Sequence, residues 1–548
     1  MQRAAEREKS EREGGASGSP GESPRKTFAI ISHPDAGKTT LTEKFLLYSG
    51  AIQLAGAVKS RKQAAARSDW MEMERQRGIS ISSTVLGLTY GNYRLNLLDT
   101  PGHRDFSEDT YRTLYATDCA LMVLDAAKGL EPQTLKLFEV CRMRGVPIIT
   151  FVNKMDRPSR EPLELIDQIE QTLGLETAPV IWPVGNGPDF EGVVERSTGR
   201  FVRHGRTAHG ASAGSEASVP FEEAAELCSP GIYEAAREEL GLLDAVGAGF
   251  DEAARESFLG GELTPVFFGS ALSNFGVRQL LEAVVELAPG PVPREGADGE
   301  LRGLDEPFSG LVFKVQANMD PRHRDQVAFV RVCSGRFQRG MPVTHAPSGR
   351  TVPTRHAQQM FAEERSTLEE AIPGDIVGLV NAGGLRVGDS VYSERPISFP
   401  GIPEFEPEHF LLARNRDTSK YKQFRRGLEQ LSEEGAVKVL QRSHTGAQEP
   451  VLGAVGPLQF EVAAYRMEHE FGAPLSTRRA PFDVCRRVDE ASAGALDGRR
   501  GVEIVRDGRG SPFALFESRY WLERAEQDLG YGVGVGPAVG SAAGSAAE

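Results

Sequence analysis

Short apolar runs alternate with longer amphipathic segments across the first half of the chain. Segments of helix length, such as Glu131–Arg144 and Pro162–Leu173, lie between runs rich in Val, Ile, Leu and Phe. Such runs are typical of strands buried on both faces of a parallel sheet. They are Phe28–Ile31, Leu95–Leu98, Leu121–Leu124, Pro147–Val152 and Pro265–Phe268. Because strands alternate with helices, we expect an α/β fold with a doubly wound, mostly parallel sheet.

The pattern changes at two proline-rich junctions, 289–293 and 400–407. Between them, strand-like runs follow one another with Gly and Pro turns, which predicts a small β-barrel. Those runs are Phe308–Val315, Gln326–Val332 and Asp375–Val380. Beyond the second junction, apolar residues recur at helical spacing, which predicts helices in a C-terminal α/β domain. The two recurring sets are Phe424, Leu428 and Leu431, and Leu458, Val462 and Tyr465.

Three segments have too little apolar surface to support a core. Residues 1–25 contain ten charged residues and no Val, Ile, Leu or aromatic residue, so we expect a disordered extension. They also lack the continuous apolar run of a signal peptide. Residues 531–548 and 204–219 are rich in Gly, Ala and Ser, and we expect a flexible tail and a mobile loop there.

Composition narrows the class of protein. The 548 residues are enough for three or four domains, at roughly 150 residues each. A net charge of −14 argues against a generic duplex binder. The five cysteines form no C-x-x-C pair, which argues against a disulfide framework and a cysteine zinc site and favours a cytoplasmic protein. The most apolar segment, Cys119–Ala127, is interrupted by Asp125, so no transmembrane helix is expected.

The first candidate motif follows the first predicted strand and has the features of a phosphate-binding loop. Lys38 supplies a point charge for the outer phosphates, and the Thr39 hydroxyl is a candidate Mg²⁺ ligand. Backbone amides that open onto a helix N-terminus hold phosphate charge well. Ser32 stands where the general pattern has its first glycine. The whole motif is Ser32, His33, Pro34, Asp35, Ala36, Gly37, Lys38, Thr39 and Thr40.

The second motif, Asp99-Thr100-Pro101-Gly102-His103, follows the strand Leu95–Leu98. A carboxylate at the end of a strand can hold Mg²⁺ through water. Gly102 lets a backbone amide approach a γ-phosphate because it has no Cβ. His103 is then placed to reach the attacking water, so we expect it to be the catalytic residue.

The third motif, Asn153-Lys154-Met155-Asp156, ends the strand Pro147–Val152 and selects the base. An Asp carboxylate can accept from the ring N–H and the exocyclic amino group of guanine, whereas adenine would leave it unpaired. The fourth motif, Ser270-Ala271-Leu272, follows Pro265–Phe268, and its amides can receive the guanine carbonyl oxygen.

All four motifs come directly after predicted strands, which is the edge where open α/β sheets bind ligands. Together they predict a GTP-binding domain with GTP or GDP and Mg²⁺ as its ligands. The organisation we expect is a GTP-binding domain over 26–295, with an insertion around 160–262, a β-barrel over 305–398 and a C-terminal α/β domain over 402–530.

The motifs also resemble those of the ribosome-dependent translational GTPases. The chain combines Pro34–Thr40 with Arg75-Gln-Arg-Gly-Ile-Ser80, Asp99–His103 and Asn153–Asp156 in that order. By this resemblance, Ser80 is a Mg²⁺ ligand where relatives carry Thr, and Pro34 and Ile79 flank the catalytic His103. Relatives have other apolar residues in place of Pro34.

Within this family the chain resembles the peptide chain release factor three branch, related to elongation factors G and Tu. Its length is too short for elongation factor G, and elongation factor Tu lacks the excess between Asp156 and Ser270. Three longer stretches carry this part of the resemblance, which covers about residues 27–485. They are Ser107–Leu114, Phe313–Asp320 and Gly456–Val462.

The resemblance implies a ribosome-stimulated GTPase of translation termination. Such a protein drives stop-codon-reading release factors off the ribosome after peptide release, without codon specificity and without cleaving the peptidyl-tRNA ester. The chain has no Gly-Gly-Gln tripeptide. The implied partners are the ribosome, through rRNA and ribosomal proteins, and the release factors. We expect a monomer with no membrane contact.

Two basic clusters are candidates for rRNA contact. The first is Arg322, His323 and Arg324, and the second is Arg414, Arg416, Lys420, Lys422, Arg425 and Arg426. Three alternatives stay open at this stage: another translational GTPase, such as an elongation or ribosome-protection factor; a metabolic P-loop kinase; and a GTP-binding scaffold without turnover. The kinase has no use for the guanine motif, and His103 argues against the scaffold.

Overall fold

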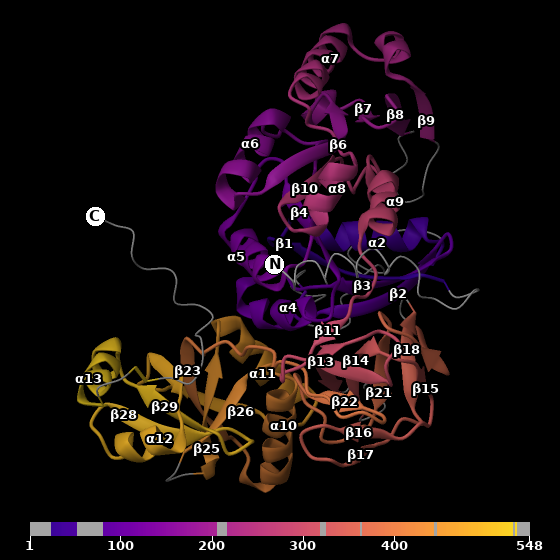
Figure 1. Cartoon of the computed structure of the whole chain (residues 1–548). Helices are drawn as coiled ribbons and strands as arrows, with labels where there is room; N and C mark the ends of the chain where they lie inside the picture. The colour runs from indigo at the N-terminus through magenta and orange to yellow at the C-terminus, as the bar shows by residue number, and fades with distance from the viewer. Residues whose placement is uncertain are drawn as a thin grey trace.

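The computed structural model describes residues 23–51, 80–204, 216–317, 325–361, 364–442, 446–529 and 532–533. Residues 75–79 and 322–324, with most of the N-terminal extension and C-terminal tail, lie outside the described residues. Figure 1 shows one domain built on a large sheet above two smaller domains that lie beside each other.

The five predicted strands are present and adjacent in one parallel sheet. β1 pairs with β3 and β4, β4 pairs with β5, and β5 pairs with β10, all in parallel. Their bounds are β1 Arg25–Ser32, β3 Tyr93–Asp99, β4 Cys119–Asp125, β5 Ile148–Asn153 and β10 Leu263–Phe268. The predicted doubly wound, mostly parallel sheet is therefore confirmed.

The sheet extends further on both sides than the sequence patterns indicated. On one side, β2 (Thr84–Tyr90) pairs with β3 antiparallel. On the other, β6 (Glu176–Val184) pairs with β10 in parallel, and three antiparallel strands follow it. These are β7 Gly192–Glu195, β8 Arg200–His204 and β9 Glu216–Pro220. The prediction of a loop over 204–219 is thus wrong at both ends, because β8 and β9 are paired strands there. Residues 205–215 lie outside the described part of the chain.

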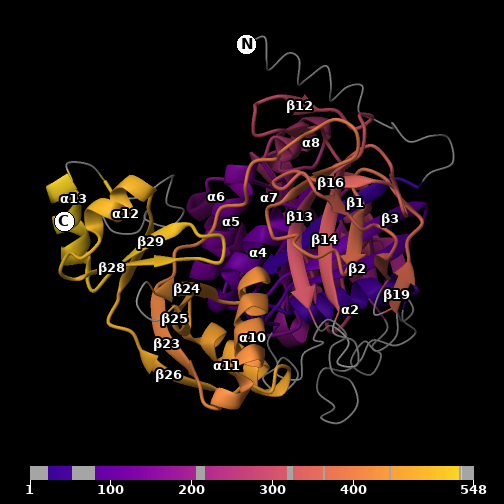
Figure 2. The same ribbon diagram turned by 90° about the horizontal axis from the view of Figure 1, so that it is seen from below.

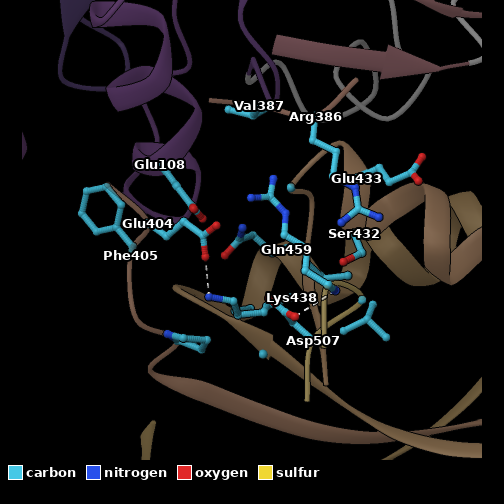
Figure 3. A pocket seen from close by; sticks show the side chains of 18 of the residues that line it. Glu108, Arg386, Val387, Glu404, Phe405, Ser432, Glu433, Lys438, Gln459 and Asp507 are labelled. Atoms are coloured by element: carbon cyan, nitrogen blue, oxygen red, sulfur yellow. Dashed lines mark hydrogen bonds and ion pairs between the residues drawn. The ribbon is translucent and has the colours of Figure 1, made fainter. Parts of the chain in front are cut away.

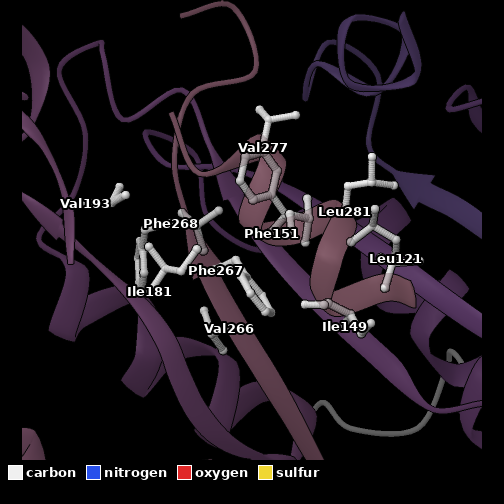
Figure 4. Packing of buried hydrophobic residues seen from close by; sticks show 14 of the residues in the cluster. Leu121, Ile149, Phe151, Ile181, Val193, Val266, Phe267, Phe268, Val277 and Leu281 are labelled. Carbon is white, nitrogen blue, oxygen red and sulfur yellow. The ribbon is translucent and has the colours of Figure 1, made fainter. Parts of the chain in front are cut away.

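Helices cover both faces of this sheet. α2 and α9 pack on one face, and α4 and α5 pack on the other. In β1, Phe28 and Ile30 join the first core, whereas Ala29 and Ile31 join the second, as the alternation of a strand requires. Figure 4 shows Leu121, Ile149 and Phe151 on the side of the sheet that carries Leu281 of α9. The helices of this domain are α2 Lys38–Tyr48, α4 Ser107–Leu114, α5 Pro132–Arg144, α6 Pro162–Leu173, α7 Pro230–Ala245, α8 Glu252–Leu259 and α9 Val277–Leu287, with 3₁₀ turns η1 Arg104–Phe106, η2 Gly187–Asp189 and η4 Phe221–Glu226.

The second unit consists of antiparallel strands around its own core. Alternate residues of β13 and β14, such as Val312 and Val330, meet Val377 and Val391 inside it, as in a small barrel. The strands are β11 Arg294–Glu295, β12 Leu301–Arg302, β13 Ser309–Ala317, β14 Gln326–Ser334, β15 Phe337–Gln338, β16 Val343–His345, β17 Thr351–Val352, β18 Ala357–Phe361, β19 Glu364–Thr367, β20 Glu370–Ala371, β21 Ile376–Val380 and β22 Ser390–Tyr392.

The third unit has a seven-stranded sheet in the order β26-β23-β25-β24-β28-β29-β27, with antiparallel pairing throughout. Phe424, Leu428 and Leu431 are buried on α10, as their spacing predicted. Val533 is buried next to α13, so the predicted tail begins with an anchored residue. The elements are β23 His409–Asn415, η5 Thr418–Lys420, α10 Tyr421–Glu433, β24 Lys438–Arg442, β25 Gly446–Ala454, α11 Pro457–His469, β26 Leu475–Arg479, β27 Val484–Arg487, α12 Glu490–Leu496, β28 Val502–Arg506, β29 Pro512–Phe516 and α13 Arg519–Leu529.

A buried polar network joins the barrel to the large sheet. Arg331 of β14 is 1% exposed, pairs with Asp118 at 2.5 Å and donates to the Gly374 carbonyl at 2.6 Å. Thr27 and Asn96 donate to the same carbonyl, at 2.7 and 3.1 Å. Because buried charges are costly unless paired, this network fixes how the barrel sits on the sheet.

We predict that Arg331→Ala destabilises the protein by about 3–5 kcal/mol, because it leaves the Asp118 carboxylate buried without its partner. The matched control is Arg339→Ala, which removes an exposed pair with Glu369 and should cost at most about 1 kcal/mol. Thermal unfolding monitored by calorimetry compares the two. Equal midpoints for both variants would show that the buried pair does not hold the domains together.

Candidate active site

The phosphate-binding loop connects β1 to α2 through two left-handed residues. Asp35 has φ 66° and Gly37 has φ 99°, and α2 begins at Lys38. The Ala36 N–H donates back to the His33 carbonyl at 3.3 Å, which closes the turn. A loop at a helix N-terminus whose residues alternate between right-handed and left-handed backbone conformations forms a concavity that binds anions. The first motif therefore has the backbone that phosphate binding requires.

The Asn153 side chain ties three of the four motifs together. Its amide nitrogen donates to the Ala36 carbonyl at 2.7 Å, and its amide oxygen accepts from Lys154 N at 2.9 Å and Ala271 N at 2.8 Å. Asn153 is 2% exposed. A Cβ at Gly37 would lie 2.2 Å from the Asn153 amide nitrogen. The close approach of these loops thus explains why position 37 is a glycine.

The Lys154 side chain links the loop of the third motif to its neighbours. Its ammonium donates to the Asp125 carboxylate at 2.7 Å and to the Asp35 carbonyl. Burial raises the pKa of Asp125, but the hydrogen bonds from Lys154 and the Ala127 N–H, together with the nearby lysine charges, outweigh burial and leave the pKa below its ordinary value. Asp125 was missed as a site residue, although a carboxylate closing an apolar strand is a visible signal.

Asp156 has the free acceptor that base recognition requires. Its Oδ1 is buried and has no hydrogen-bond partner within the described part of the chain. The Met155 N–H donates to the Gly269 carbonyl at 3.0 Å, which joins this loop to the fourth motif. There, Ser270 is fully buried and Leu272 is 37% exposed. Since a buried unpaired oxygen is costly, this carboxylate fits a ligand that donates to it, as guanine does.

The second motif lies beside the phosphate-binding loop. Lys38 pairs with Asp99 Oδ1, while Asp99 Oδ2 is buried without a partner. A Cβ at Gly102 would lie 3.2 Å from Pro34 N. The Thr100 hydroxyl donates to the Ile30 carbonyl at 2.6 Å, and the Thr110 hydroxyl donates to the Pro101 carbonyl at 3.0 Å. These two bonds fix the start of the motif.

The residues that could hold Mg²⁺ come from three segments. Thr39 and Thr40 are half-buried in the first turn of α2, and Ser80 is half-buried. Lys314 of the barrel donates to Ser82 Oγ at 2.6 Å and fixes the chain just after Ser80. No group of three or more His, Cys, Asp or Glu in the described part of the chain could bind a metal unaided. One carboxylate with hydroxyls fits Mg²⁺, which keeps waters and takes phosphate oxygens as further ligands.

His103 lies at the rim of the site, and its side chain is 38% exposed. Its Nδ1 accepts from the Asp105 backbone N–H at 3.2 Å. His33, the other histidine of these motifs, lies 3.1 Å from Glu131 through Nε2. His103 is therefore held at one ring nitrogen, and its ring is accessible to solvent.

A separate cavity of about 330 Å³ opens where the three units meet (Figure 3). It lies between α4, the segment before β23, α10 and β24. Burial raises the pKa of Glu404 in its wall, but the Lys438 ammonium 2.8 Å away overcomes burial and keeps the pKa below its ordinary value. The lining includes none of the motif residues, so this cavity is not the nucleotide site.

Comparison with known proteins assigns each part of the chain. Residues 23–290 match the elongation factor Tu GTP binding domain, 307–394 match elongation factor G domain 2, and 399–526 match the C-terminal domain of class II release factor RF3. Peptide chain release factor 3 of Synechococcus elongatus is 51% identical over 510 residues, which are 92% of this chain and 91% of that protein. The chain belongs to the peptide chain release factor 3 family.

Other relatives agree with this assignment. Peptide chain release factor 3 of Trichodesmium erythraeum is 50% identical over 92% of this chain and 93% of its own length, and that of Symbiobacterium thermophilum is 51% identical over 85% and 88%. A crystal structure of a protein from Thermus thermophilus matches with a TM-score of 0.67 and 24% identity over 89% of this chain and 72% of that one, which supports the fold.

The chain is therefore a GTP-hydrolysing enzyme of translation termination that binds guanine nucleotides. Its membership of this family disfavours the elongation and ribosome-protection alternatives. Within the described residues, no helix is both long and apolar enough to span a membrane.

We predict that Asp156→Asn weakens GTP binding by about 10²-fold, because the guanine ring N–H and amino group lose their shared acceptor. The same change should improve binding of xanthosine nucleotides, whose 2-oxo group needs a donor. Equilibrium titration with guanosine and xanthosine nucleotides measures both changes in affinity. GTP affinity equal to that of the wild type would remove Asp156 from base recognition.

Proposed function

We propose that this chain acts on the terminating ribosome, where its GTP form drives stop-codon-reading release factors off and GTP hydrolysis then lets it leave. The observation that carries the proposal is the convergence of three of the four motif loops on Asn153, combined with the family to which the chain belongs. Peptide release itself is left to the stop-codon-reading factors. We also propose that the chain works as a monomer in the cytoplasm.

The nucleotide is held from both ends. Lys38 and the amides of residues 35–40 bind the phosphates, and Asp156 with residues 270–272 binds guanine. Thr39, Ser80 and, through water, Asp99 would hold Mg²⁺, which would neutralise the charge of the outer phosphates. The buried unpaired oxygens of Asp99 and Asp156 lie in the two motifs that need an acceptor or a ligand, and this supports the assignment.

His103 is the proposed catalytic residue. It belongs to the loop whose Gly102 approaches the phosphate-binding loop at Pro34. Phosphoryl transfer depends on positioning and electrostatics. Because the ring is partly exposed and, among the residues that the structure describes, is hydrogen-bonded through Nδ1, we propose that ribosomal RNA completes its placement in trans.

The second basic cluster supports a ribosome-docking surface. Arg416, Lys422 and Arg426 are exposed around the end of β23 and the start of α10, and Arg478 and Arg479 lie on the neighbouring strand β26. A local basic face of this kind can contact rRNA despite the net charge of −14. Arg414, Arg425 and Arg478 contribute less because each is paired with a glutamate, at 2.5, 2.8 and 3.1 Å.

We predict that His103→Ala binds GTP as tightly as the wild type but loses at least ~10²-fold of ribosome-stimulated hydrolysis, since it removes one positioned catalytic group. The variant should still displace a labelled release factor with GTP and then leave the ribosome slowly. Stopped-flow measurements with purified ribosomes follow both steps.

His356→Ala, an exposed histidine of the barrel, is the matched control and should behave as the wild type. Hydrolysis by His103→Ala within a few-fold of the wild-type rate would rule out the catalytic role. Failure of the GTP-bound wild-type chain to accelerate release-factor departure would overturn the proposed function itself.

A further inference from the structure

The N-cap residue of helix α11 has no side chain to accept from the helix, although the Gln459 side chain accepts from the Gly456 N–H at 3.2 Å. That N-cap residue is Gly456, and Pro457 at the first helical position has no N–H to donate. The next donor, Leu458 N–H, is accepted by Asp105 Oδ2 at 2.8 Å, from a residue 353 positions earlier in the chain. Asp105 of the GTP-binding domain therefore supplies the carboxylate that usually comes from the N-cap residue.

The packing around this contact leaves no room for a side chain at position 456. Asp105 is 8% exposed, and a Cβ at Gly456 would lie 2.1–2.4 Å from the atoms of its carboxyl group. Gly456 has φ −147°, which any residue can adopt, so backbone conformation does not require a glycine here. The carboxylate of Asp105 is what occupies the space of a side chain at position 456.

The same aspartate holds His103. Its backbone N–H donates to His103 Nδ1 at 3.2 Å, and its Oδ1 lies 3.4 Å from that nitrogen. Whatever bonds one ring nitrogen of a histidine sets the tautomer and orientation of the other. Asp105 thus joins the N-terminus of α11 to Nδ1 of His103.

A small apolar cluster surrounds this junction. Ile81, one residue after Ser80, and Phe106 pack against Val462, Leu458 and Tyr465 of α11. Figure 2 shows α11 and α10 beneath the domain that carries α4. α11 therefore contacts the segments that follow both Ser80 and His103, and the cavity of Figure 3 lies beside it, with Gln459 in its wall.

We propose that Asp105 is a positioning residue through which the docking of α11 controls His103. The inference rests on the proposed catalytic role of His103. With α11 docked, the Leu458 N–H holds the Asp105 carboxylate, and this fixes η1 and the ring in the geometry from which the ribosome completes catalysis. The C-terminal domain then acts on hydrolysis without touching the nucleotide.

A double-mutant cycle tests the coupling. Asp105→Ala removes the carboxylate, and Gly456→Ala displaces it from the other domain. Each should slow single-turnover GTP hydrolysis on saturating ribosomes by about 10-fold, the lower range for a residue that orients a functional histidine, with GTP affinity unchanged. The double variant should be no slower than Asp105→Ala, because a methyl group at 456 has nothing left to displace.

Matched variants separate this effect from general damage. Gly494→Ala in α12 meets nothing within 4 Å of its Cβ and should match the wild type. Asp105→Asn keeps an oxygen for the Leu458 N–H and should lose less than Asp105→Ala. If Asp105→Ala does not fold, Asp105→Ser replaces it in the cycle.

The outcomes distinguish the two proposals. Wild-type rates for Asp105→Ala and Gly456→Ala, while His103→Ala is inactive, would overturn the coupling and leave the proposed function intact. Losses that multiply in the double variant, or an equal loss in Asp105→Asn and Asp105→Ala, would also overturn it. Full activity of His103→Ala would instead remove the proposed function on which the coupling rests.

Discussion

The nucleotide site depends on one buried amide. Asn153 makes hydrogen bonds with its nitrogen and its oxygen, and these bonds reach loops that follow β1, β5 and β10. A buried amide that is left unsatisfied is costly, so the three loops are stable together and unfavourable apart. The glycine at position 37 follows from this constraint, since any side chain there would occupy the place of the amide nitrogen. The parallel sheet brings the loops to one edge, and Asn153 fixes their spacing.

The other two domains make polar contacts with segments that border the nucleotide site. Lys314 of the barrel holds the chain beyond Ser80, and Asp105 receives the N-terminus of α11. Arg331 anchors the barrel to the sheet through the buried pair with Asp118. The segments that follow Ser80 and His103 are thus each in contact with a domain other than the one that carries the four motifs. This arrangement gives the hydrolysis site a physical connection to the parts of the chain available to dock on a partner.

Much of the fold could be predicted because the central strands are buried on both faces and are therefore continuously apolar. The strand β6 was missed because it contains two prolines, which argue against a strand inside a sheet. The antiparallel pairing of the C-terminal sheet could not be foreseen, because strand direction depends on connections rather than on composition. The motif residues could be found because each follows a predicted strand. The roles of the residues that support them could not, since these roles depend on distant partners. Lys314 depends on Ser82, and Asp105 depends on Leu458. Asp125 is visible as a carboxylate that ends an apolar strand, but its role depends on Lys154.

His103 connects the nucleotide site to the C-terminal domain, because Asp105 holds its Nδ1 while the ring stays accessible to a partner. The catalytic role proposed for His103 therefore predicts that an external group completes its placement, as activating partners do for other GTPases. The most direct measurement is the single-turnover rate of GTP hydrolysis by the wild-type chain with and without purified ribosomes. We expect slow hydrolysis by the chain alone and an acceleration of at least ~10²-fold by ribosomes. Equal rates under the two conditions would contradict the account.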